Sequence, residues 1–340
     1  MSDIAIIGAG AWGTALSIVL GRKDTHQIRL WVHEKEVCDT IAQQRVNEKF
    51  LPGQQIPACV TPCNDLAEAL DGATIVVSAM PSQHCRQLFE QMRSHLRAEA
   101  MIVSATKGLE ENSLLRMTEV IAQILKGNNR PLPRTGALSG PSFALEAARG
   151  DPTAITIASH DVELARTVQQ EFSNASFRVY TNQDPIGVEL GGALKNTIAI
   201  AAGVCAGLGL GHNSVAALIT RGLAEITRLV VACGGKAETM AGLAGLGDLV
   251  LTCTGGLSRN RSVGVELGRG RKLPEILAGM HGMVAEGIST TTAAVGLARA
   301  RSIEMPITEQ MYAILHQGKA PREAISQLMT RSGKSETLRP

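Results

Sequence analysis

The first half of the chain alternates short apolar runs of strand length with segments of helical length. The strand-like runs are residues 4–7, 28–32, 74–77, 101–103, 135–138 and 154–157, and helical segments such as 14–20 and 113–125 lie between most of them. Continuous apolar strands that alternate with helices are typical of a parallel sheet covered by helices on both faces. The pattern predicts an α/β domain with a mostly parallel sheet.

The pattern changes close to residue 185. Beyond it no convincing strand follows, and the sequence favours helices with interspersed glycines, among them Gly191, Gly192, Gly203 and Gly207. Glycine inside a helix costs about 1 kcal/mol relative to alanine, so these positions need a packing or functional reason. We therefore predict an α/β domain over residues 1–185 and an all-helical domain over residues 186–340.

Composition excludes several classes of protein. The chain has 340 residues with 33 Lys and Arg against 31 Asp and Glu, and only 3% of its residues are aromatic. It lacks the basic patch and the stacking surface of a nucleic-acid-binding protein. The N-terminus shows no export signal, and the apolar stretch 197–210 is shorter than the roughly 20 residues that span a bilayer. The seven scattered cysteines form no CxxC pair, which favours a reduced, cytoplasmic setting.

A glycine-rich turn follows the first strand-like run. Gly8-Ala9-Gly10-Ala11-Trp12-Gly13 is a GxGxxG motif between the run 4–7 and a helical segment. In such motifs the first glycine allows a tight turn, the second lets the backbone approach a pyrophosphate, and the third lets the helix pack on the strand. The free N–H groups at the helix start attract the diphosphate. We predict that this turn binds a dinucleotide.

The end of the second strand-like run leaves the choice of nicotinamide cofactor open. The acid that holds the ribose 2′-OH of NAD usually lies about 20 positions after the glycines, and Glu34 is a candidate that lies late for this spacing. His33 is instead suited to the 2′-phosphate of NADP. A solvated strand end without either role is the other interpretation. Of the two cofactors we favour NADPH, and NAD is the alternative.

Two polar segments follow later strands of the predicted sheet. Lys107 comes after the run 101–103, and Gly140 and Ser142 follow the run 135–138. Ligands of open α/β sheets bind beyond the carboxyl ends of the strands, so these residues are candidates for an anionic substrate and the nicotinamide end of the cofactor. A surface lysine and an ordinary capped turn are the structural alternatives. We expect a helix over 144–149 that begins with a proline in its first turn and is stopped by Gly150.

The helical half carries a lysine in an apolar, glycine-rich helix. Reduction of a ketone by hydride creates an alkoxide, which needs a proton donor such as Lys195. Asp248 follows a glycine-rich segment and is a candidate partner for this lysine. Ser258, Arg259 and Asn260 cluster the hydrogen-bond donors that suit a phosphate, although a charged surface loop is the alternative. The eight histidines have no HxxxH or HExxH spacing, so no metal site is expected.

Taken together, the motifs are more specific than any one of them. The segments GAGAWGTAL, SATKGLE, SGPSFA, GGALKN, AGLGDLVLTCT, SRNRS, VAEG and EMPITE occur in this order over residues 3–330. Because it carries these segments in this order and over this length, the chain closely resembles the bacterial NAD(P)-dependent glycerol-3-phosphate dehydrogenases. The resemblance implies a Rossmann-type cofactor domain, a helical domain with the catalytic lysine, and interconversion of dihydroxyacetone phosphate and sn-glycerol 3-phosphate for glycerophospholipid synthesis.

The resemblance also implies roles for individual residues. It makes Lys195 the proton donor and acceptor. It places substrate contacts at Lys107, Gly140, Ser142, Asp248, Ser258, Arg259 and Asn260. It places cofactor contacts at Ala11, Trp12, His33, Lys107, Ala144, Arg259, Val284 and Glu286, beside the motif glycines Gly8, Gly10 and Gly13. The family often has serine where this chain has Ala11, so only a backbone contact is expected there.

Two other functions compete with this interpretation. One is a different two-domain dehydrogenase that acts on a hydroxy acid or a ketopantoate-type substrate, and it also uses a lysine borne by a helix. The other is a protein that senses NAD(P) without turnover. The oligomeric state is open, with a homodimer possible, and the physiological direction and any feedback regulation are open as well.

Overall fold

The computed structural model describes residues 2–126, 133–280, 285–333 and 335–336. The chain forms two compact units, Met1–Lys107 with Leu115–Glu189 and Gly108–Leu114 with Leu190–Pro340. The division falls within a few residues of the predicted boundary at residue 185. The short segment Gly108–Leu114 joins the second unit, which the sequence did not indicate.

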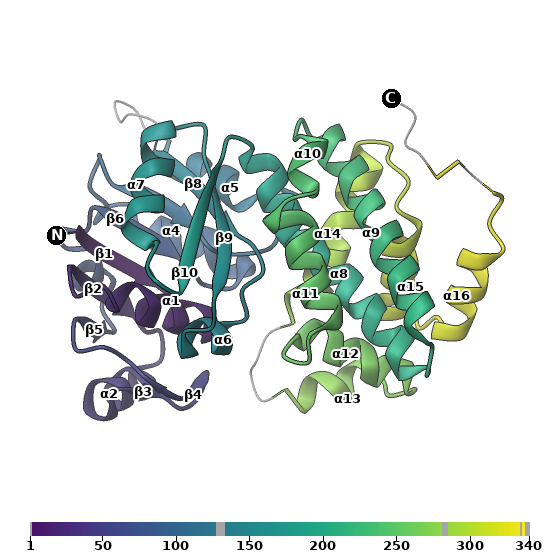
Figure 1. Cartoon of the computed structure of the whole chain (residues 1–340), viewed down its shortest axis with the longest axis horizontal. Helices are drawn as coiled ribbons and strands as arrows, with labels where there is room; N and C mark the ends of the chain where they lie inside the picture. The colour runs from purple at the N-terminus through teal and green to yellow at the C-terminus, as the bar shows by residue number, and fades with distance from the viewer. Residues whose placement is uncertain (1, 127–132, 281–284, 334, 337–340) are drawn as a thin grey trace. The chain divides into compact units, whose positions relative to one another are not determined.

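An eight-stranded sheet forms the centre of the first unit (Figure 1). Its strands, in spatial order, are β10 (Phe177–Asn182), β9 (Thr153–Ala158), β8 (Arg134–Ser139), β7 (Met101–Ser104), β6 (Ile75–Ser78), β1 (Ser2–Ile7), β2 (His26–Trp31) and β5 (Val60–Cys63). Strands β8 and β9 pair antiparallel, and all the other neighbours pair parallel. The mostly parallel α/β sheet predicted from the sequence is confirmed.

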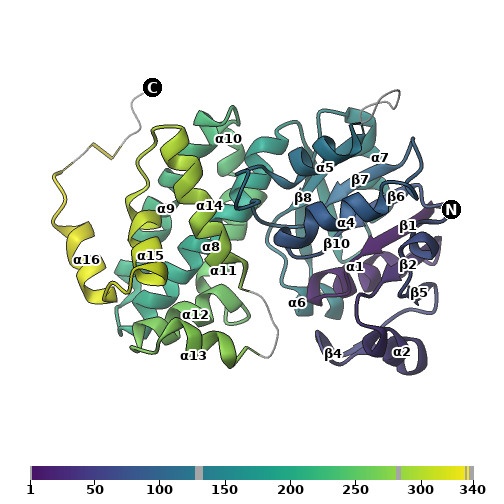
Figure 2. The same ribbon diagram turned by 180° about the vertical axis from the view of Figure 1, so that it is seen from behind.

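Helices cover both faces of this sheet (Figures 1 and 2). Ile4 and Ile6 of β1 point into one core and Ala5 and Ile7 into the other, because side chains alternate along a strand. The first core takes residues from α1 (Ala11–Gly21), α2 (Lys35–Gln44), α6 (Ala144–Arg149) and α7 (Val162–Phe172). The second takes residues from α3 (Leu66–Leu70), α4 (Cys85–Met92) and α5 (Met117–Leu125). A short hairpin of β3 (Val46–Asn47) and β4 (Leu51–Gln55) and a 3₁₀ turn, Ser82–His84, complete the unit.

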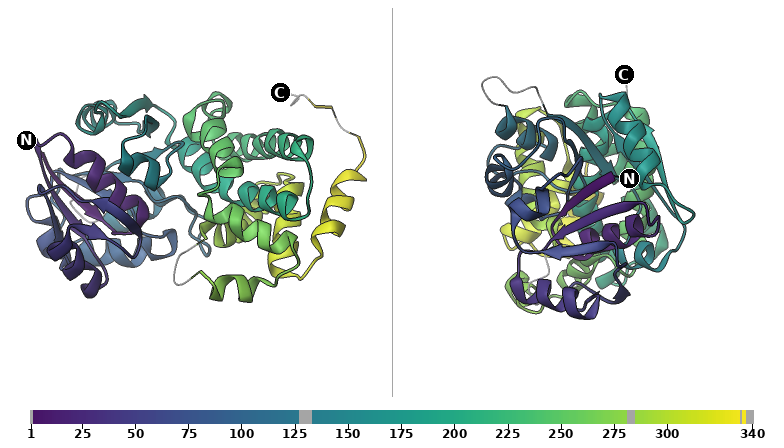
Figure 3. Two further views of the ribbon diagram at one scale, coloured as in Figure 1. Left: turned by 60° about the horizontal axis from the view of Figure 1, so that its bottom comes forward. Right: turned by 90° about the vertical axis from the view of Figure 1, so that its left-hand side faces the viewer.

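All the elements that the structure describes in the second unit are helices or helical turns (Figure 3). Helix α8 (Pro185–Gly207) begins in the first unit and continues into the second. The helices that follow are α9 (His212–Ala232), α10 (Ala237–Met240), α11 (Asp248–Thr254), α12 (Arg259–Gly268), α13 (Leu273–Ala278), α14 (Glu286–Ala300), α15 (Pro306–His316) and α16 (Pro321–Met329). A π-helical turn, Leu243–Gly247, leads directly into α11.

Helix α8 is the core helix of this unit. Among the described residues it alone is long and apolar enough to cross a membrane, and 89% of its most apolar window is buried inside the protein. At 23 residues it starts well before the stretch 197–210 that the sequence suggested. Burial of this kind is what a core helix of a globular unit shows.

Glycines in α8 allow a very close approach to α12. A Cβ atom on Gly203 would lie 2.0 Å from the carbonyl oxygen of Arg261, and one on Gly264 would lie 2.0 Å from that of Ile200. Gly207 and Gly268 repeat the contact one turn later. Helix packing is therefore the reason for the glycines at 203 and 207. Gly191 packs on the π-helical turn, where a Cβ atom would lie 2.8 Å from the carbonyl oxygen of Ala244.

Candidate functional site

The turn between β1 and α1 has the geometry that the GxGxxG motif predicts. Gly8 has φ +114°, which favours glycine, and a Cβ atom on Gly13 would lie 1.8 Å from the carbonyl oxygen of Gly8. A Cβ atom on Gly10, in contrast, would meet no atom within 4 Å. Gly8 and Gly13 are thus required by the fold, whereas the space beside Gly10 is open to an approaching group.

Helix α1 begins without a side-chain cap. Gly10 at the N-cap has no side chain, and the first turn contains no acidic residue. The backbone N–H groups of Ala11 and Trp12 therefore lie at an uncompensated helix N-terminus, which is a favourable place for a diphosphate. The Trp12 indole N–H is buried and has no hydrogen-bond partner among the described residues.

A buried asparagine that the sequence analysis missed supports this turn. The Asn47 side-chain amide donates hydrogen bonds to the carbonyl oxygen of Ala9 and to the hydroxyl of Thr14, both at 2.8 Å. Its own carbonyl oxygen accepts a bond from the Phe50 N–H at 3.2 Å. Asn47 lies in the hairpin, far from the motif in sequence, and no local pattern points to it.

The end of β2 places His33 and Glu34 in different surroundings. The Asn64 side-chain amide donates to the carbonyl oxygens of Val32 at 2.6 Å and His33 at 2.8 Å, which fixes the backbone here. Glu34 forms an exposed ion pair with Lys49 at 3.3 Å. The acid that the sequence offered for a ribose hydroxyl thus already has a cationic partner, while the His33 ring lies beside Trp31.

The residues predicted at two strand ends come together. Strands β7 and β8 are neighbours, and the Lys107 ammonium donates to the carbonyl oxygen of Gly140 at 3.2 Å. The Ser142 hydroxyl donates to the same oxygen at 2.9 Å. Gly140 has φ +144°, and a Cβ atom there would lie 2.9 Å from Cα of Ile155, so glycine is required.

One prediction about this segment is wrong. Helix α6 does run from Ala144 to Arg149 and ends at Gly150, which has left-handed backbone angles. Its N-cap, however, is Phe143, so Pro141 precedes the helix and is not in the first turn. The proline shapes the loop between β8 and the helix rather than the helix start, and Ala144 opens the helix against the core of the unit.

In the second unit, Lys195 is held by two residues of α11. Its ammonium forms an ion pair with the Asp248 carboxylate and donates to the Thr252 hydroxyl at 2.8 Å. The side chains of Lys195 and Asp248 are 8% and 1% exposed. The Thr252 hydroxyl in turn donates to the Asp248 backbone carbonyl at 2.6 Å, so its oxygen faces the lysine as an acceptor. The expected partnership of Lys195 with Asp248 is present.

Thr252 was not identified from the sequence. It lies four residues after Asp248, and positions i and i+4 share one face of a helix. That spacing is the signal that was available. Gly245, three residues before Asp248, serves packing, since a Cβ atom there would lie 2.3 Å from the carbonyl oxygen of Met240.

The start of α12 brings together Ser258, Arg259 and Asn260 with Glu286. Ser258 is the N-cap, and its hydroxyl oxygen accepts the Arg261 N–H at 3.2 Å. Burial lowers the pKa of the Arg259 guanidinium, and the negative charge of Glu286 partly offsets this. The Asn260 carbonyl oxygen accepts the Gly287 N–H at 2.9 Å, which leaves its NH₂ group as the donor for a ligand. Val284, also predicted to contact cofactor, lies outside the described residues.

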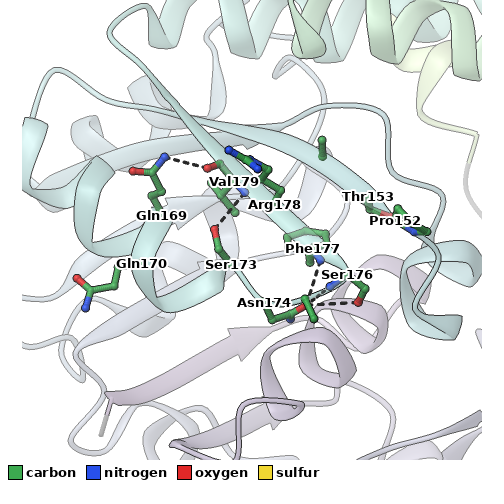
Figure 4. Close-up of a pocket in the computed structure, with 12 residues that line it drawn as sticks. Pro152, Thr153, Gln169, Gln170, Ser173, Asn174, Ser176, Phe177, Arg178 and Val179 are labelled. Atoms are coloured by element: carbon green, nitrogen blue, oxygen red, sulfur yellow. Dashed lines mark hydrogen bonds between the residues drawn. The ribbon is translucent and has the colours of Figure 1, made fainter.

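A surface pocket of about 670 Å³ lies elsewhere in the first unit, along β10 (Figure 4). Its lining includes Gln169, Ser173, Asn174 and Phe177 but none of the predicted site residues. Here α7 and the loop after it bond to the outer edge of β10. The Ser173 hydroxyl oxygen accepts the Val179 N–H at 3.2 Å, and the Gln169 side-chain amide donates to the Val179 carbonyl oxygen at 2.9 Å. The Asn174 side-chain oxygen accepts the Phe177 N–H at 3.0 Å, and the Asn174 backbone N–H donates to the Phe177 carbonyl oxygen at 2.8 Å.

Burial disfavours the thiolate form at two of the cysteines. All seven cysteines are free thiols, and burial raises the pKa of Cys63 and Cys253 to about 12. The described residues contain no group of three or more His, Cys, Asp or Glu side chains that could hold a metal ion.

Both halves of the chain match family models. Residues 3–165 match the NAD-dependent glycerol-3-phosphate dehydrogenase N-terminus, and residues 184–326 match the C-terminus. The chain belongs to the NAD-dependent glycerol-3-phosphate dehydrogenase family. A relative from Koribacter versatilis named glycerol-3-phosphate dehydrogenase [NAD(P)+] is 66% identical over 336 residues, which cover 99% of each chain.

Solved structures agree with this membership. The crystal structure of glycerol-3-phosphate dehydrogenase from Coxiella burnetii superimposes with a TM-score of 0.92 at 41% identity, and covers 97% of this chain and 99% of that one. A ketopantoate reductase of the PanE/ApbA family from Ralstonia eutropha has a TM-score of 0.58 at 18% identity, over 95% of this chain and 99% of that one. The latter likeness is one of fold alone, so membership of the glycerol-3-phosphate dehydrogenase family outweighs the ketopantoate alternative.

Proposed function

We propose that this protein is an NAD(P)-dependent glycerol-3-phosphate dehydrogenase, an oxidoreductase that acts on a CH–OH group. It reversibly reduces dihydroxyacetone phosphate to sn-glycerol 3-phosphate. The observation that carries the proposal is the buried lysine of α8, held by Asp248 and Thr252, in a chain that matches the family over both of its halves.

We assign cofactor binding to residues 1–185 and substrate binding with catalysis to residues 186–340. The open space beside Gly10 and the uncapped start of α1 fit a diphosphate. The nicotinamide cofactor, when bound, supplies the hydride. The remaining cofactor contacts that we propose are Gly8, Ala11, Trp12, Gly13, His33, Lys107, Ala144, Arg259, Val284 and Glu286.

Lys195 is the proposed proton donor and acceptor. As the carbonyl carbon of the ketone gains a hydride, the carbonyl oxygen becomes an alkoxide and takes a proton from the Lys195 ammonium. In the reverse direction the neutral amine removes that proton from the hydroxyl. Asp248 and Thr252 hold the Lys195 nitrogen in one position, so little motion is required before each transfer.

Phosphate recognition falls to donors at two places. Arg259 offers a bidentate guanidinium, and Asn260 offers the NH₂ group that its bond to Gly287 leaves available. Ser258 lies at the N-cap of α12, where a helix start also favours an anion. Lys107, Gly140 and Ser142 complete the proposed substrate contacts.

The resemblance to the family supports three further proposals. The product supplies glycerophospholipid synthesis, the enzyme is cytoplasmic, and two chains form a homodimer. Light scattering of the purified protein at several concentrations tests the last of these, and a mass that stays at one chain contradicts it.

The decisive assay follows oxidation of NADPH and NADH with dihydroxyacetone phosphate, and with ketopantoate as the competing substrate. We expect turnover of the phosphate substrate with a higher rate for NADPH. Lys195→Met is expected to lower kcat by about 100-fold or more while the dissociation constant of NADPH stays the same. Lys272→Met, which changes an exposed lysine of the same unit, is the matched control.

Each outcome of this assay has one meaning. Absence of turnover with dihydroxyacetone phosphate in the wild type contradicts the proposed function. Bound NADPH without turnover of any substrate would favour the sensor. A kcat of Lys195→Met equal to that of the wild type would contradict the role of Lys195 as the proton donor and acceptor.

A further inference from the structure

Gly287 is the point where three helices of the second unit touch. It is the second residue of α14. A Cβ atom at this position would lie 2.8 Å from Oδ1 of Asn260 on α12, and 2.9 Å from the carbonyl oxygen of Asn196 on α8. Both of these atoms are polar, and the Asn196 oxygen belongs to the backbone. The first turn of α14 therefore packs against both helices only because residue 287 has no side chain.

The backbone N–H of Gly287 is bonded across this junction, and its carbonyl oxygen is bonded within α14. Its N–H donates to Oδ1 of Asn260 at 2.9 Å, and its carbonyl oxygen accepts the Thr291 hydroxyl at 2.5 Å. The Thr291 hydroxyl also shares a hydrogen bond of 2.9 Å with the hydroxyl of Thr197 on α8. These groups are buried. The first turn of α14 is therefore fixed to α12 through the Gly287 N–H, and the next turn is fixed to α8 through the Thr291 hydroxyl.

The Asn260 bond replaces a local cap. The N-cap of α14 is Ala285, which has no side-chain acceptor for the N–H groups of the first turn. Asn260 provides that acceptor from another helix. An unpaired buried N–H would cost free energy, so the position of α14 depends on Asn260 staying where it is.

The residues beside this junction are those that the proposed function uses. Asn196 follows Lys195 on α8, Asn260 follows Arg259 on α12, and Gly287 follows Glu286. Arg259 and Glu286 are also close enough to interact through their charges. A shift of the Gly287 backbone would therefore move the proposed cofactor contact Glu286 relative to the proposed substrate contact Asn260.

We propose that Gly287 is a positioning residue that couples the two binding events: through its bond to Asn260, bound cofactor at Glu286 raises the affinity for the phosphate substrate. The inference rests on the proposed function. It assigns Gly287 no contact with either ligand. Its action is to keep the Asn260 amide, and hence the NH₂ group that we assign to the substrate, in register with the first turn of α14.

The test measures this coupling directly in the full-length protein. NADPH and sn-glycerol 3-phosphate are both reduced, so they bind together without turnover. Calorimetric titration gives the dissociation constant of sn-glycerol 3-phosphate with and without saturating NADPH. We expect the wild type to bind it about fivefold or more tightly with NADPH, a ratio typical of coupled sites. Gly287→Ala is expected to bring the ratio to within about twofold of 1.

Gly296→Ala is the matched control on the same helix. The three atoms nearest to a Cβ atom there all belong to the Leu114 side chain, the closest at 3.0 Å, and this side chain can rotate away. We expect this variant to keep the wild-type ratio and kcat. A Gly287→Ala protein that keeps the wild-type ratio would overturn the inference while turnover with dihydroxyacetone phosphate leaves the proposed function standing.

A second variant covers the case in which Gly287→Ala does not fold. Asn260→Ala removes the acceptor without adding atoms. Although Asn260 is assigned to the substrate alone, we expect the dissociation constant of NADPH to rise by about threefold to tenfold, the effect of one lost hydrogen bond. An unchanged NADPH dissociation constant in Asn260→Ala would overturn the coupling.

Discussion

At the scale of single residues, the site depends on a charged lysine held inside an apolar helix. Removing a charge from water is costly unless it is paired and hydrogen-bonded. Asp248 supplies the opposite charge and Thr252 the additional acceptor, both from the first two turns of α11. Each of the two partners therefore contributes to where the Lys195 nitrogen lies as well as to its charge.

Thr252→Val removes the acceptor for Lys195 while keeping the shape of the side chain. Hydrogen bonds to charged groups contribute about 1.5–3 kcal/mol, so we expect kcat to fall by about tenfold or more with an unchanged dissociation constant for NADPH. Thr254→Val is the control, because Thr254 is exposed on the same helix and its hydroxyl donates to the carbonyl four residues earlier. Equal kcat values for the two variants would contradict a role of Thr252 at the lysine.

At the scale of elements, the α8–α12 crossing is set by backbone contact. The paired glycines let carbonyl oxygens of each helix lie against the Cα atoms of the other. Because backbone atoms cannot rotate aside, a methyl group at this crossing must separate the helices. The proposed proton donor on α8 and the proposed phosphate donors on α12 thus share one tightly fixed interface.

Gly264→Ala is expected to lower the free energy of unfolding by about 3 kcal/mol or more, since its Cβ atom would lie 2.0 Å from the Ile200 carbonyl oxygen. Gly256→Ala, where a Cβ atom meets nothing within 4 Å, should change it by less than about 0.5 kcal/mol. Urea unfolding measures both. A Gly264→Ala protein as stable as the wild type would mean that the crossing can widen at no cost.

The junction of α9 and α15 should respond to pH. Glu225 accepts the Ile307 N–H at 2.7 Å and the Thr308 N–H at 3.3 Å at the start of α15. Burial raises the pKa of Glu225 from 4.5 to about 7, although these bonds and the charge of Arg228 oppose the rise. Between these values the folded protein holds a proton that the unfolded chain releases. Stability from this group therefore falls as the pH rises from about 4.5 to 7, by up to about 3 kcal/mol.

Urea unfolding across this pH range tests the sign. The stability of the wild type minus that of Glu225→Gln should decrease from pH 4.5 to pH 7 and stay level above it. Glu323→Gln changes an exposed carboxylate on α16 and should give a difference with no such slope. Parallel pH curves for the wild type and Glu225→Gln would contradict the shift.

The sequence predicted elements well where the signal is local. The six apolar runs are all strands, and the residues expected at the ends of β7 and β8 do meet. Strand β5 contains Pro62 and strand β10 alternates buried and exposed residues, so neither shows a continuous apolar run, and both were missed. The antiparallel direction of β9 has no local signature either.

The same reasoning explains which site residues were found. Lys195 and Asp248 stand in glycine-rich segments that attract attention in a sequence. Thr252 and Asn47 act through contacts between elements, and their residue types are common everywhere. The bond from Asn260 to Gly287 likewise depends on how α12 and α14 pack.

At the scale of the whole molecule, cofactor binding should stabilise the fold. A ligand at 100 times its dissociation constant adds about 2.7 kcal/mol to the free energy of unfolding. Gly10→Ala should unfold at the wild-type temperature without cofactor, because a Cβ atom there meets nothing within 4 Å. With NADPH we expect the wild-type increase in melting temperature to be absent, since the methyl group occupies the space that we assign to the diphosphate.

Gly13→Ala gives the contrasting result in the same melting experiment. Its Cβ atom would lie 1.8 Å from the Gly8 carbonyl oxygen, so this variant should melt earlier even without cofactor. A Gly10→Ala protein that NADPH stabilises as much as the wild type would contradict the assignment of this turn to the diphosphate.

The closed outer edge of β10 bears on how the protein behaves among other chains. The N–H and C=O groups of Phe177 and Val179 are bonded to residues 169–174 of the same chain. An incoming strand would have to displace these internal bonds before forming its own, so this edge resists both β-aggregation and peptide capture. The homodimer proposed above is therefore expected to form through a surface other than this edge, and crowding in a cell should not add a further strand at β10.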